Sequence, residues 1–146
     1  MTAGVADAFD FDGVTGMGVL SDSMVAAVLR ADDLARARTF YTEVLGLAPG
    51  PSSPAGDVFM AGKGTAVVIY ERLGMPAPQN TTLGFAVDAA EFDAAVSGLK
   101  AKGVVFEEYD IPEMGLKTVD GVATFGDSKA AWFKDSEGNI INIAVM

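Results

Sequence analysis

Apolar residues recur along the chain at strand-like and helix-like spacings, and these spacings predict the same order of elements twice. The first copy opens with an apolar run over 24–30, which predicts a buried strand. Apolar residues three and four positions apart over 34–45 then predict a helix with one buried face. Asp32 or Asp33 is a suitable N-cap for this helix, and Gly46 is a suitable residue to end it.

Strands are expected after this first helix. The segment 49–56 is rich in proline, serine and glycine, so it predicts a turn or a short, irregular strand. Residues 58–61 and 65–71 are expected to pair as a hairpin across the turn 62–64. A linker rich in turn-forming residues follows over 74–80.

The second copy begins with a strand predicted over 81–87. Asp88 and Glu91 form a capping-box pattern at the start of the next helix, which Gly103 ends. Three more strands are expected over 104–109, 129–134 and 139–145. The connection 111–128 is long for a compact domain, so it is expected either to form a lid or to pack as a surface elaboration.

The two copies align with each other, because 29–32 matches 85–88 at an offset of 56 residues. Each copy consists of a strand, a helix and three strands, which predicts an α+β fold of two paired βαβββ modules. A ferredoxin-like domain is the alternative, but it has fewer strands after each helix. The expected organisation is an acidic N-terminal extension (1–22) and a single domain (23–146) made of module one (23–73), a linker (74–80) and module two (81–146).

The extension 1–22 holds four aspartates and no basic residue. Phe9 and Phe11 alternate with aspartates, which predicts a short edge strand that docks on the body of the protein or on a partner chain. Together with the open edges expected for the two sheets, this segment favours a symmetric homodimer.

The chain contains no cysteine and no histidine. Disulfides, thiolate nucleophiles, zinc–thiolate sites and iron–sulfur clusters are therefore excluded. A histidine general base, a Ser-His-Asp triad and imidazole metal ligands are excluded as well. Any catalysis would depend on acidic, basic, tyrosine, serine or threonine side chains.

The formal net charge of −10 makes nucleic acid an unexpected partner, because phosphate binding needs a clustered positive surface. Such a charge favours cationic small molecules at long range. No apolar run approaches the length of a membrane span, and no basic residue precedes Arg30, as a secretory signal would require. The sequence therefore predicts a cytoplasmic protein without a membrane partner.

Two motifs resemble the vicinal oxygen chelate superfamily, also called the glyoxalase/bleomycin-resistance/dioxygenase family. One is the helix containing Phe40-Tyr41 and Val44-Leu45-Gly46-Leu47, and the other is the turn Asp135-Ser136-Glu137-Gly138-Asn139. The resemblance covers about residues 23–146. It implies two βαβββ modules whose sheets curl around a shared cleft, which in the family usually holds a divalent metal ligated from the first and last strands of each module.

At the positions of the family's metal ligands, this chain lacks strong donors. The resemblance places those positions on Ala26, Thr82, Asn142 and either Ile69 or Glu71. A divalent ion needs several anionic or imidazole donors that converge. The expectation is the family scaffold without a metal or other cofactor, and therefore without the family's metal-dependent lyase or dioxygenase chemistry.

Six residues are the candidates to contact a ligand in the cleft. Strand alternation groups Ala26, Val28 and Arg30 on one face, which the resemblance places in the cleft. Arg30 could bind a carboxylate, pair with Glu71 or lie at the rim, and Trp132 is the favoured residue for stacking on a flat ligand. The candidate ligand-binding residues are Trp132, Tyr70, Arg30, Asn142, Glu71 and Tyr109.

Three functions are compatible with these features. The leading hypothesis is metal-free binding of a hydrophobic or aromatic small molecule, such as a cationic antibiotic. The alternative is a metal-independent isomerase or lyase that uses Tyr70, Glu71 or Arg30 in the same cleft. A third hypothesis is an interaction module whose N-terminal segment engages a partner.

Overall fold

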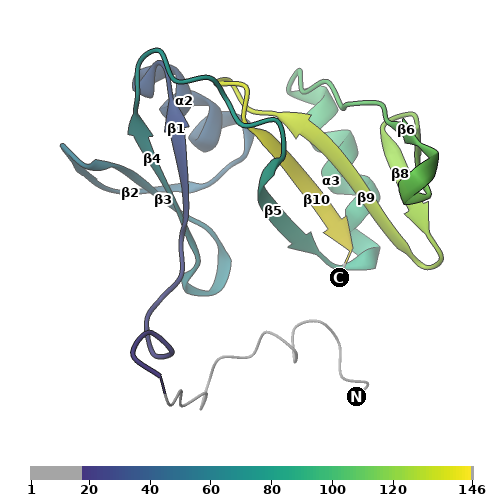
Figure 1. Cartoon of the computed structure of the whole chain (residues 1–146), viewed down its shortest axis with the longest axis horizontal. Coiled ribbons are helices and arrows are strands. Elements are labelled where there is room, and N and C mark those ends of the chain that lie inside the picture. The colour runs from purple at the N-terminus through teal and green to yellow at the C-terminus, as the bar shows by residue number, and fades with distance from the viewer. Residues whose placement is uncertain (1–17, 146) are drawn as a thin grey trace.

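The computed structural model describes residues 18–145 and contains two βαβββ-like modules (Figure 1). The edge strand predicted around Phe9 and Phe11 lies outside the described residues. Module one contains β1 (Ala27–Ala31), α2 (Leu34–Thr39), the π-helix η1 (Phe40–Val44), β2 (Ala48–Ser53), β3 (Gly56–Met60), the 3-10 helix η2 (Gly62–Gly64) and β4 (Ala66–Glu71). Module two contains β5 (Thr81–Val87), α3 (Ala89–Ala101), β6 (Asp110–Ile111), the 3-10 helix η3 (Pro112–Met114), β7 (Leu116–Val119), β8 (Val122–Phe125), β9 (Ser128–Lys134) and β10 (Ile140–Val145).

The two sheets share one pairing pattern. Sheet one has four strands in the order β1-β4-β3-β2, and sheet two has six in the order β5-β10-β9-β8-β7-β6. In both sheets the first strand of the module pairs in parallel with its last strand, β1 with β4 and β5 with β10. The predicted α+β fold of two modules is therefore confirmed.

The region 104–128 of module two differs from its prediction. The strand expected over 104–109 is reduced to a single bridge between Phe106 and Phe133. The expected loop 111–128 instead forms β6, β7 and β8, which extend sheet two. Gly121 makes the β7–β8 turn with φ of +80°, and a Cβ there would lie 2.7 Å from Phe106 Cβ. Only glycine fits this turn, so the segment that suggested a loop is a compact hairpin.

The helix starts also show one difference from expectation. Asp33 caps α2, because its side chain accepts a hydrogen bond from the Arg36 amide at 3.1 Å. Asp88 occupies the N-cap of α3 but its side chain makes no capping hydrogen bond, so the predicted capping box does not form. A backbone hydrogen bond from the Glu91 amide to the Asp88 carbonyl, at 2.9 Å, closes the first turn instead.

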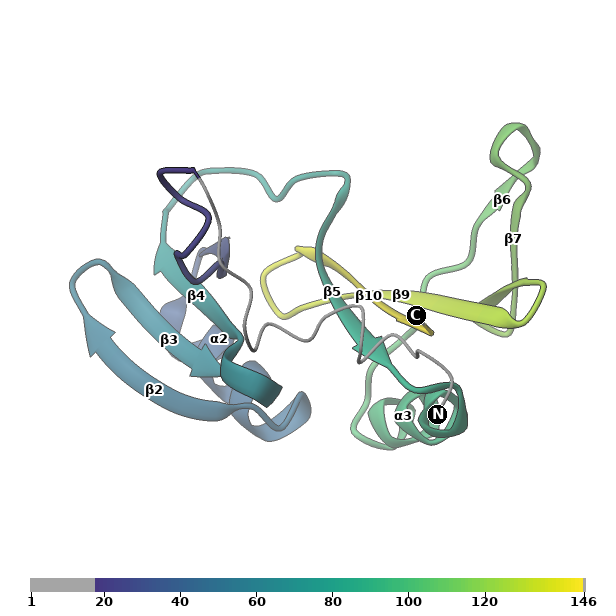
Figure 2. The same ribbon diagram turned by 90° about the horizontal axis from the view of Figure 1, so that it is seen from below.

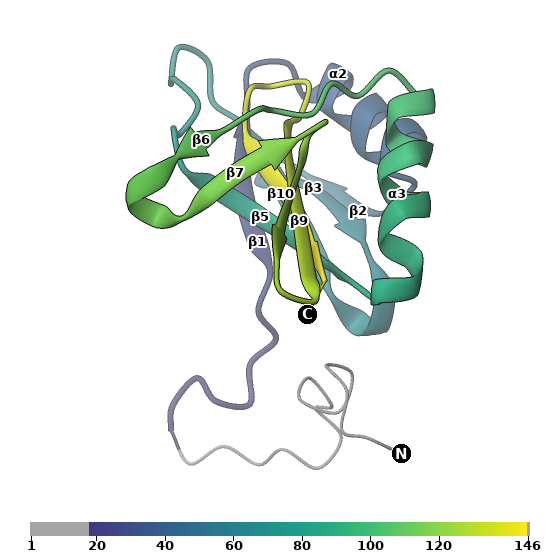
Figure 3. The same cartoon turned by 90° about the vertical axis from the view of Figure 1, so that its right-hand side faces the viewer.

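Both helices cover the same side of the two sheets (Figure 3). On that side, Leu29 and Ile69 from sheet one and Phe133 and Ile141 from sheet two are almost fully buried. The β6–β7 end of sheet two turns away from α3, toward the side that carries no helix (Figure 2). Within residues 18–145, no helix is long and apolar enough to cross a membrane.

Candidate functional site

The helix-free face of sheet two carries a row of three residues from neighbouring strands. Asn142 in β10 lies opposite Trp132 in β9 and beside Gly84 in β5. The residues that flank Trp132, Ala131 and Phe133, are buried on the other face. Since successive side chains of a strand point to opposite faces, Trp132 lies on the side away from α3.

Gly84 allows the Asn142 amide to lie directly over the β5 backbone. A Cβ at position 84 would stand 2.5 Å from Asn142 Oδ1, although the Gly84 backbone is not left-handed. The glycine is therefore needed for close approach and not for an unusual φ. Within residues 18–145 the Asn142 side chain makes no hydrogen bond, so its donors and acceptor remain available on this face.

Tyr109 forms the aromatic wall of this face together with Trp132. Their ring centroids are 5.6 Å apart, and the rings meet edge to face at 78°. Two hydrogen bonds hold the segment in place, from the Glu107 amide to the Trp132 carbonyl at 2.7 Å and from the Tyr109 amide to Thr118 Oγ1 at 2.7 Å. Burial, together with the negative charge of Glu107, raises the pKa of Tyr109, which keeps its phenol neutral.

Sheet one places Arg30 and Tyr70 side by side, on β1 and β4. The neighbouring pair in the register is Ala31 and Glu71, so Glu71 belongs to the face opposite Tyr70 and is exposed at the end of β4. The ion pair of Arg30 is made with Asp32 at 2.8 Å and not with Glu71.

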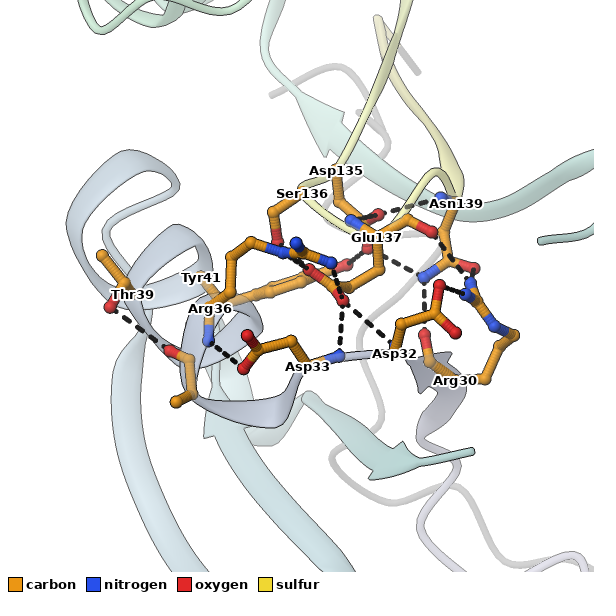
Figure 4. A network of polar contacts seen from close by, with 11 residues as sticks. Arg30, Asp32, Asp33, Arg36, Thr39, Tyr41, Asp135, Ser136, Glu137 and Asn139 are labelled. Carbon is orange, nitrogen blue, oxygen red and sulfur yellow. Dashed lines mark hydrogen bonds and ion pairs between the residues drawn. The ribbon is translucent and has the colours of Figure 1, made fainter. Parts of the chain in front are cut away.

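Arg30 is buried at the junction between the modules. Its Nη1 donates to the Glu137 carbonyl at 2.9 Å and lies 3.3 Å from Asn139 Oδ1. Asn139 Nδ2 in turn donates to the Arg30 carbonyl at 2.9 Å (Figure 4). With 4% of its surface exposed, Arg30 joins β1 to the turn before β10.

The turn 135–139 is the centre of this junction. Asp135 accepts hydrogen bonds from Tyr41 Oη at 2.6 Å, from Asn139 Nδ2 at 2.9 Å and from the amides of Glu137 and Asn139 at 2.8 Å each. Burial, followed by the charge of Asp135, raises the pKa of Tyr41 far above its ordinary value. The phenol therefore acts here as a permanent donor between the modules.

Glu137 ties the same turn to the start of α2. Its carboxylate accepts hydrogen bonds from Arg36 Nε at 2.8 Å, from the Asp33 amide at 2.9 Å and from Ser136 Oγ at 2.6 Å (Figure 4). Burial alone would raise the pKa of Glu137, but these hydrogen bonds and the charge of Arg36 lower it to about 2. This turn is recognisable in the sequence as a motif, but no local pattern indicates its partners on β1 and α2.

The positions that correspond to the family's metal ligands form a poor donor set. Ala26 offers no ligand atom, Thr82 donates its hydroxyl to the Ile140 carbonyl at 3.1 Å, and Asn142 offers one amide. Ile69 is fully buried in the core, and Glu71 lies on the same face of β4 but is exposed at the end of the strand. Residues 18–145 contain no group of three or more acidic, histidine or cysteine side chains that could hold a metal ion. Among the positions that correspond to the family's metal ligands, Glu71 alone carries an anionic donor, whereas a divalent cation is bound by several donors that converge.

Comparison with known proteins agrees with this architecture. The model of the Glyoxalase/Bleomycin resistance protein/Dioxygenase superfamily matches residues 23–143. No curated protein matches the chain significantly.

Solved structures share the fold at low sequence identity. A glyoxalase/dioxygenase from Nostoc punctiforme has 18% identity and a TM-score of 0.64, covering 90% of this chain and 95% of its own. A lactoylglutathione lyase from Agrobacterium tumefaciens has 21% identity and a TM-score of 0.60, covering 85% and 93%. A fosfomycin resistance protein from Mesorhizobium loti has 14% identity and a TM-score of 0.60, covering 86% and 92%. The family match over most of the chain and these shared folds show that the protein belongs to the glyoxalase/bleomycin resistance/dioxygenase superfamily.

Proposed function

We propose that the protein binds a flat aromatic small molecule on the helix-free face of sheet two, without a metal ion. The observation that carries the proposal is the row formed by Trp132, Asn142 and Gly84 on three neighbouring strands. The indole supplies a stacking surface, the amide supplies both a donor and an acceptor, and the glycine leaves room above β5. An apolar surface with a few placed polar groups is typical of small-molecule sites.

Charge favours a cationic ligand among flat aromatic compounds. The chain has a net charge of −10, and Glu107 and Glu108 immediately precede Tyr109 at the aromatic wall. An aromatic face attracts a cation, and nearby carboxylates strengthen that attraction. A fosfomycin resistance protein has the same fold, which supports an antibiotic as one class of ligand, and flat aromatic probes represent that class in the test.

Binding without a metal is supported by the donor set. The positions that would ligate a metal supply an alanine, an engaged threonine hydroxyl and one neutral amide. The metal-independent isomerase or lyase has less support, because Glu71 lies away from Tyr70 and the pKa of Tyr109 is raised. A general acid or base works best with a pKa near the working pH.

We also propose that the protein is a cytoplasmic homodimer. β2 and β6 are the outer strands of the two sheets, and within the described residues each pairs with one strand only, so each leaves an open edge, whereas β1 and β5 contact each other. Val25 and Val28 are 86% and 64% exposed at or near the β1 edge. A second copy is the usual means of covering open edges and exposed apolar residues. Light scattering that shows a monomer at working concentration would contradict the dimer.

Fluorescence of Trp132, the single tryptophan of the chain, tests the binding proposal. The probes are acridine, phenanthridinium and naphthalene compounds. We expect a saturable change in tryptophan emission together with a higher melting temperature, because a ligand that binds the native state stabilises it. Trp132→Ala and the control variant Lys129→Ala on the same strand are compared by the rise in melting temperature, because Trp132→Ala has no tryptophan emission. Equal binding by both variants would contradict the proposed site.

A further inference from the structure

An apolar cavity of about 320 Å³ lies on the opposite side of sheet two from Trp132, between η1, α3 and the sheet. Phe85, Phe133 and Ile143 line it from the sheet, and Val44 and Leu45 line it from η1. Because Phe133 and Trp132 are successive residues of β9, this cavity and the proposed Trp132 site lie on opposite faces of the sheet.

The cavity exists because the two helices do not fill the space between them. On α3 its lining includes Ala94, Ala95 and Gly98, and a Cβ at Gly98 would meet no heavy atom within 4 Å. On the other wall, η1 closes with a π-helical bond from the Leu45 amide to the Phe40 carbonyl at 3.0 Å. Such turns are rare and recur at functional sites.

Lys102 is the single charged residue among the described residues that line this apolar cavity. It caps the C-terminus of α3, and its Nζ donates to the neutral carbonyl of Glu43 at 2.8 Å. An ammonium has three donors, so this bond leaves two of them available. The charge therefore stands at the cavity with no carboxylate among its hydrogen-bond partners in residues 18–145.

A more polar cavity of about 400 Å³ adjoins the first one and shares Val44 and Lys102 with it. Its other charged residues either lie next to a residue of opposite charge or accept hydrogen bonds from the protein. Lys134 lies 3.9 Å from Glu107, and Asp135 accepts the hydrogen bonds of the module junction. Lys102 thus stands between an apolar hollow and a polar one.

We propose that these cavities bind a monocarboxylic acid with an apolar tail. The tail occupies the hollow between η1 and α3, and the carboxylate binds Lys102 where the two cavities meet. The volume of the apolar hollow, about 320 Å³, falls near the lower end of the range for small-molecule pockets, roughly 300–1,000 Å³. A cationic amphiphile would place like charges together at Lys102, and a neutral one would leave the ammonium unused.

Decanoate and decanol, titrated into the full chain by calorimetry, test this proposal. We expect decanoate to bind saturably with one site per chain and at least tenfold more tightly than decanol. Lys102→Gln should weaken decanoate about tenfold and leave decanol unchanged. Absence of decanoate binding up to its solubility limit, or equal binding of acid and alcohol, would overturn the assignment.

Gly98→Leu tests the location, because its side chain would fill the apolar hollow. The control is Ser97→Leu, an exposed neighbour on the same helix that does not line the cavity. Both changes place a better helix former in α3, so the melting temperature should not fall. We expect Gly98→Leu to abolish decanoate binding and Ser97→Leu to preserve it. Binding that survives Gly98→Leu would place the ligand elsewhere. Trp132→Ala should not affect decanoate, so this test is independent of the proposed aromatic site.

Discussion

The turn between β9 and β10 and the middle of the same two strands use polar residues in opposite ways. In the turn, Asp135 accepts four hydrogen bonds and Glu137 binds the start of α2. In the middle, Asn142 makes no side-chain hydrogen bond within residues 18–145 and lies beside the half-buried Trp132. Fully satisfied polar groups hold a fold together, whereas an amide without a hydrogen bond beside a half-buried ring is available to a ligand. We therefore assign the turn to stability and the middle to binding.

The largest effect is expected from Asp135→Ala in the turn. The substitution removes the acceptor of four hydrogen bonds and leaves the buried Tyr41 hydroxyl without its partner. We expect the free energy of unfolding to fall by about 3 kcal/mol or more, since each unpaired buried polar group costs about 1–3 kcal/mol. Urea denaturation measures the change. Tyr41→Phe, which removes one of the four bonds, should cost less, and a loss below about 1 kcal/mol for Asp135→Ala would contradict the structural role.

Glu137 should make stability depend on pH. Its pKa is lowered from 4.5 to about 2 in the folded protein, so its contribution is fully present above pH 4.5 and is lost as the pH falls toward 2. We expect Glu137→Gln to cost about 2 kcal/mol at neutral pH, the order of a charged hydrogen bond, and less at low pH. Urea denaturation of both proteins between pH 2 and 7 checks this. A difference that does not change with pH would show that the carboxylate charge contributes nothing.

Sequence patterns indicated the alternation within each strand but not the contacts at the junction. Alternation places Trp132 and Phe133 on opposite faces of β9, and the sequence left open, within one residue of register, which of them is buried; the pairing of β9 with β10 shows that it is Phe133. The contacts of Arg30 with Glu137 and Asn139 join residues more than 100 positions apart, and no local pattern indicates them. The sequence did not predict the hairpin of β7 and β8, because glycines in this segment are typical of an open loop. The structure shows that Gly121 is instead required by the close approach of Phe106.

Trp132→Phe should have a smaller effect, on binding and not on folding. It keeps an aromatic ring but reduces the stacking surface. We expect the affinity for a bound acridine or phenanthridinium compound to fall by about 1 kcal/mol, in line with aromatic pair energies. Calorimetry measures this without relying on tryptophan emission. Phe133→Leu on the core face should instead lower the free energy of unfolding. An unchanged affinity in Trp132→Phe would show that stacking does not contribute to binding.

Gly84→Ala should have the smallest effect on stability and a clear one on binding. The new Cβ forces Asn142 Oδ1 away from its place over β5, which a flexible side chain can accommodate. Alanine is otherwise favoured over glycine in a strand by about 0.5–1 kcal/mol, so the melting temperature should change little. Affinity for the same probes should fall, because the amide is displaced. If affinity is unchanged, Asn142 does not contact the ligand.

Ligand binding beside Trp132 should need no metal ion. The most direct test is to titrate the metal-stripped protein with the acridine and phenanthridinium probes. Tryptophan emission is the readout, and the titration is repeated with added Zn²⁺ or Mn²⁺. We expect a saturable change in emission that is the same in the presence and absence of metal. A change that requires metal, or no change with any probe, would contradict it.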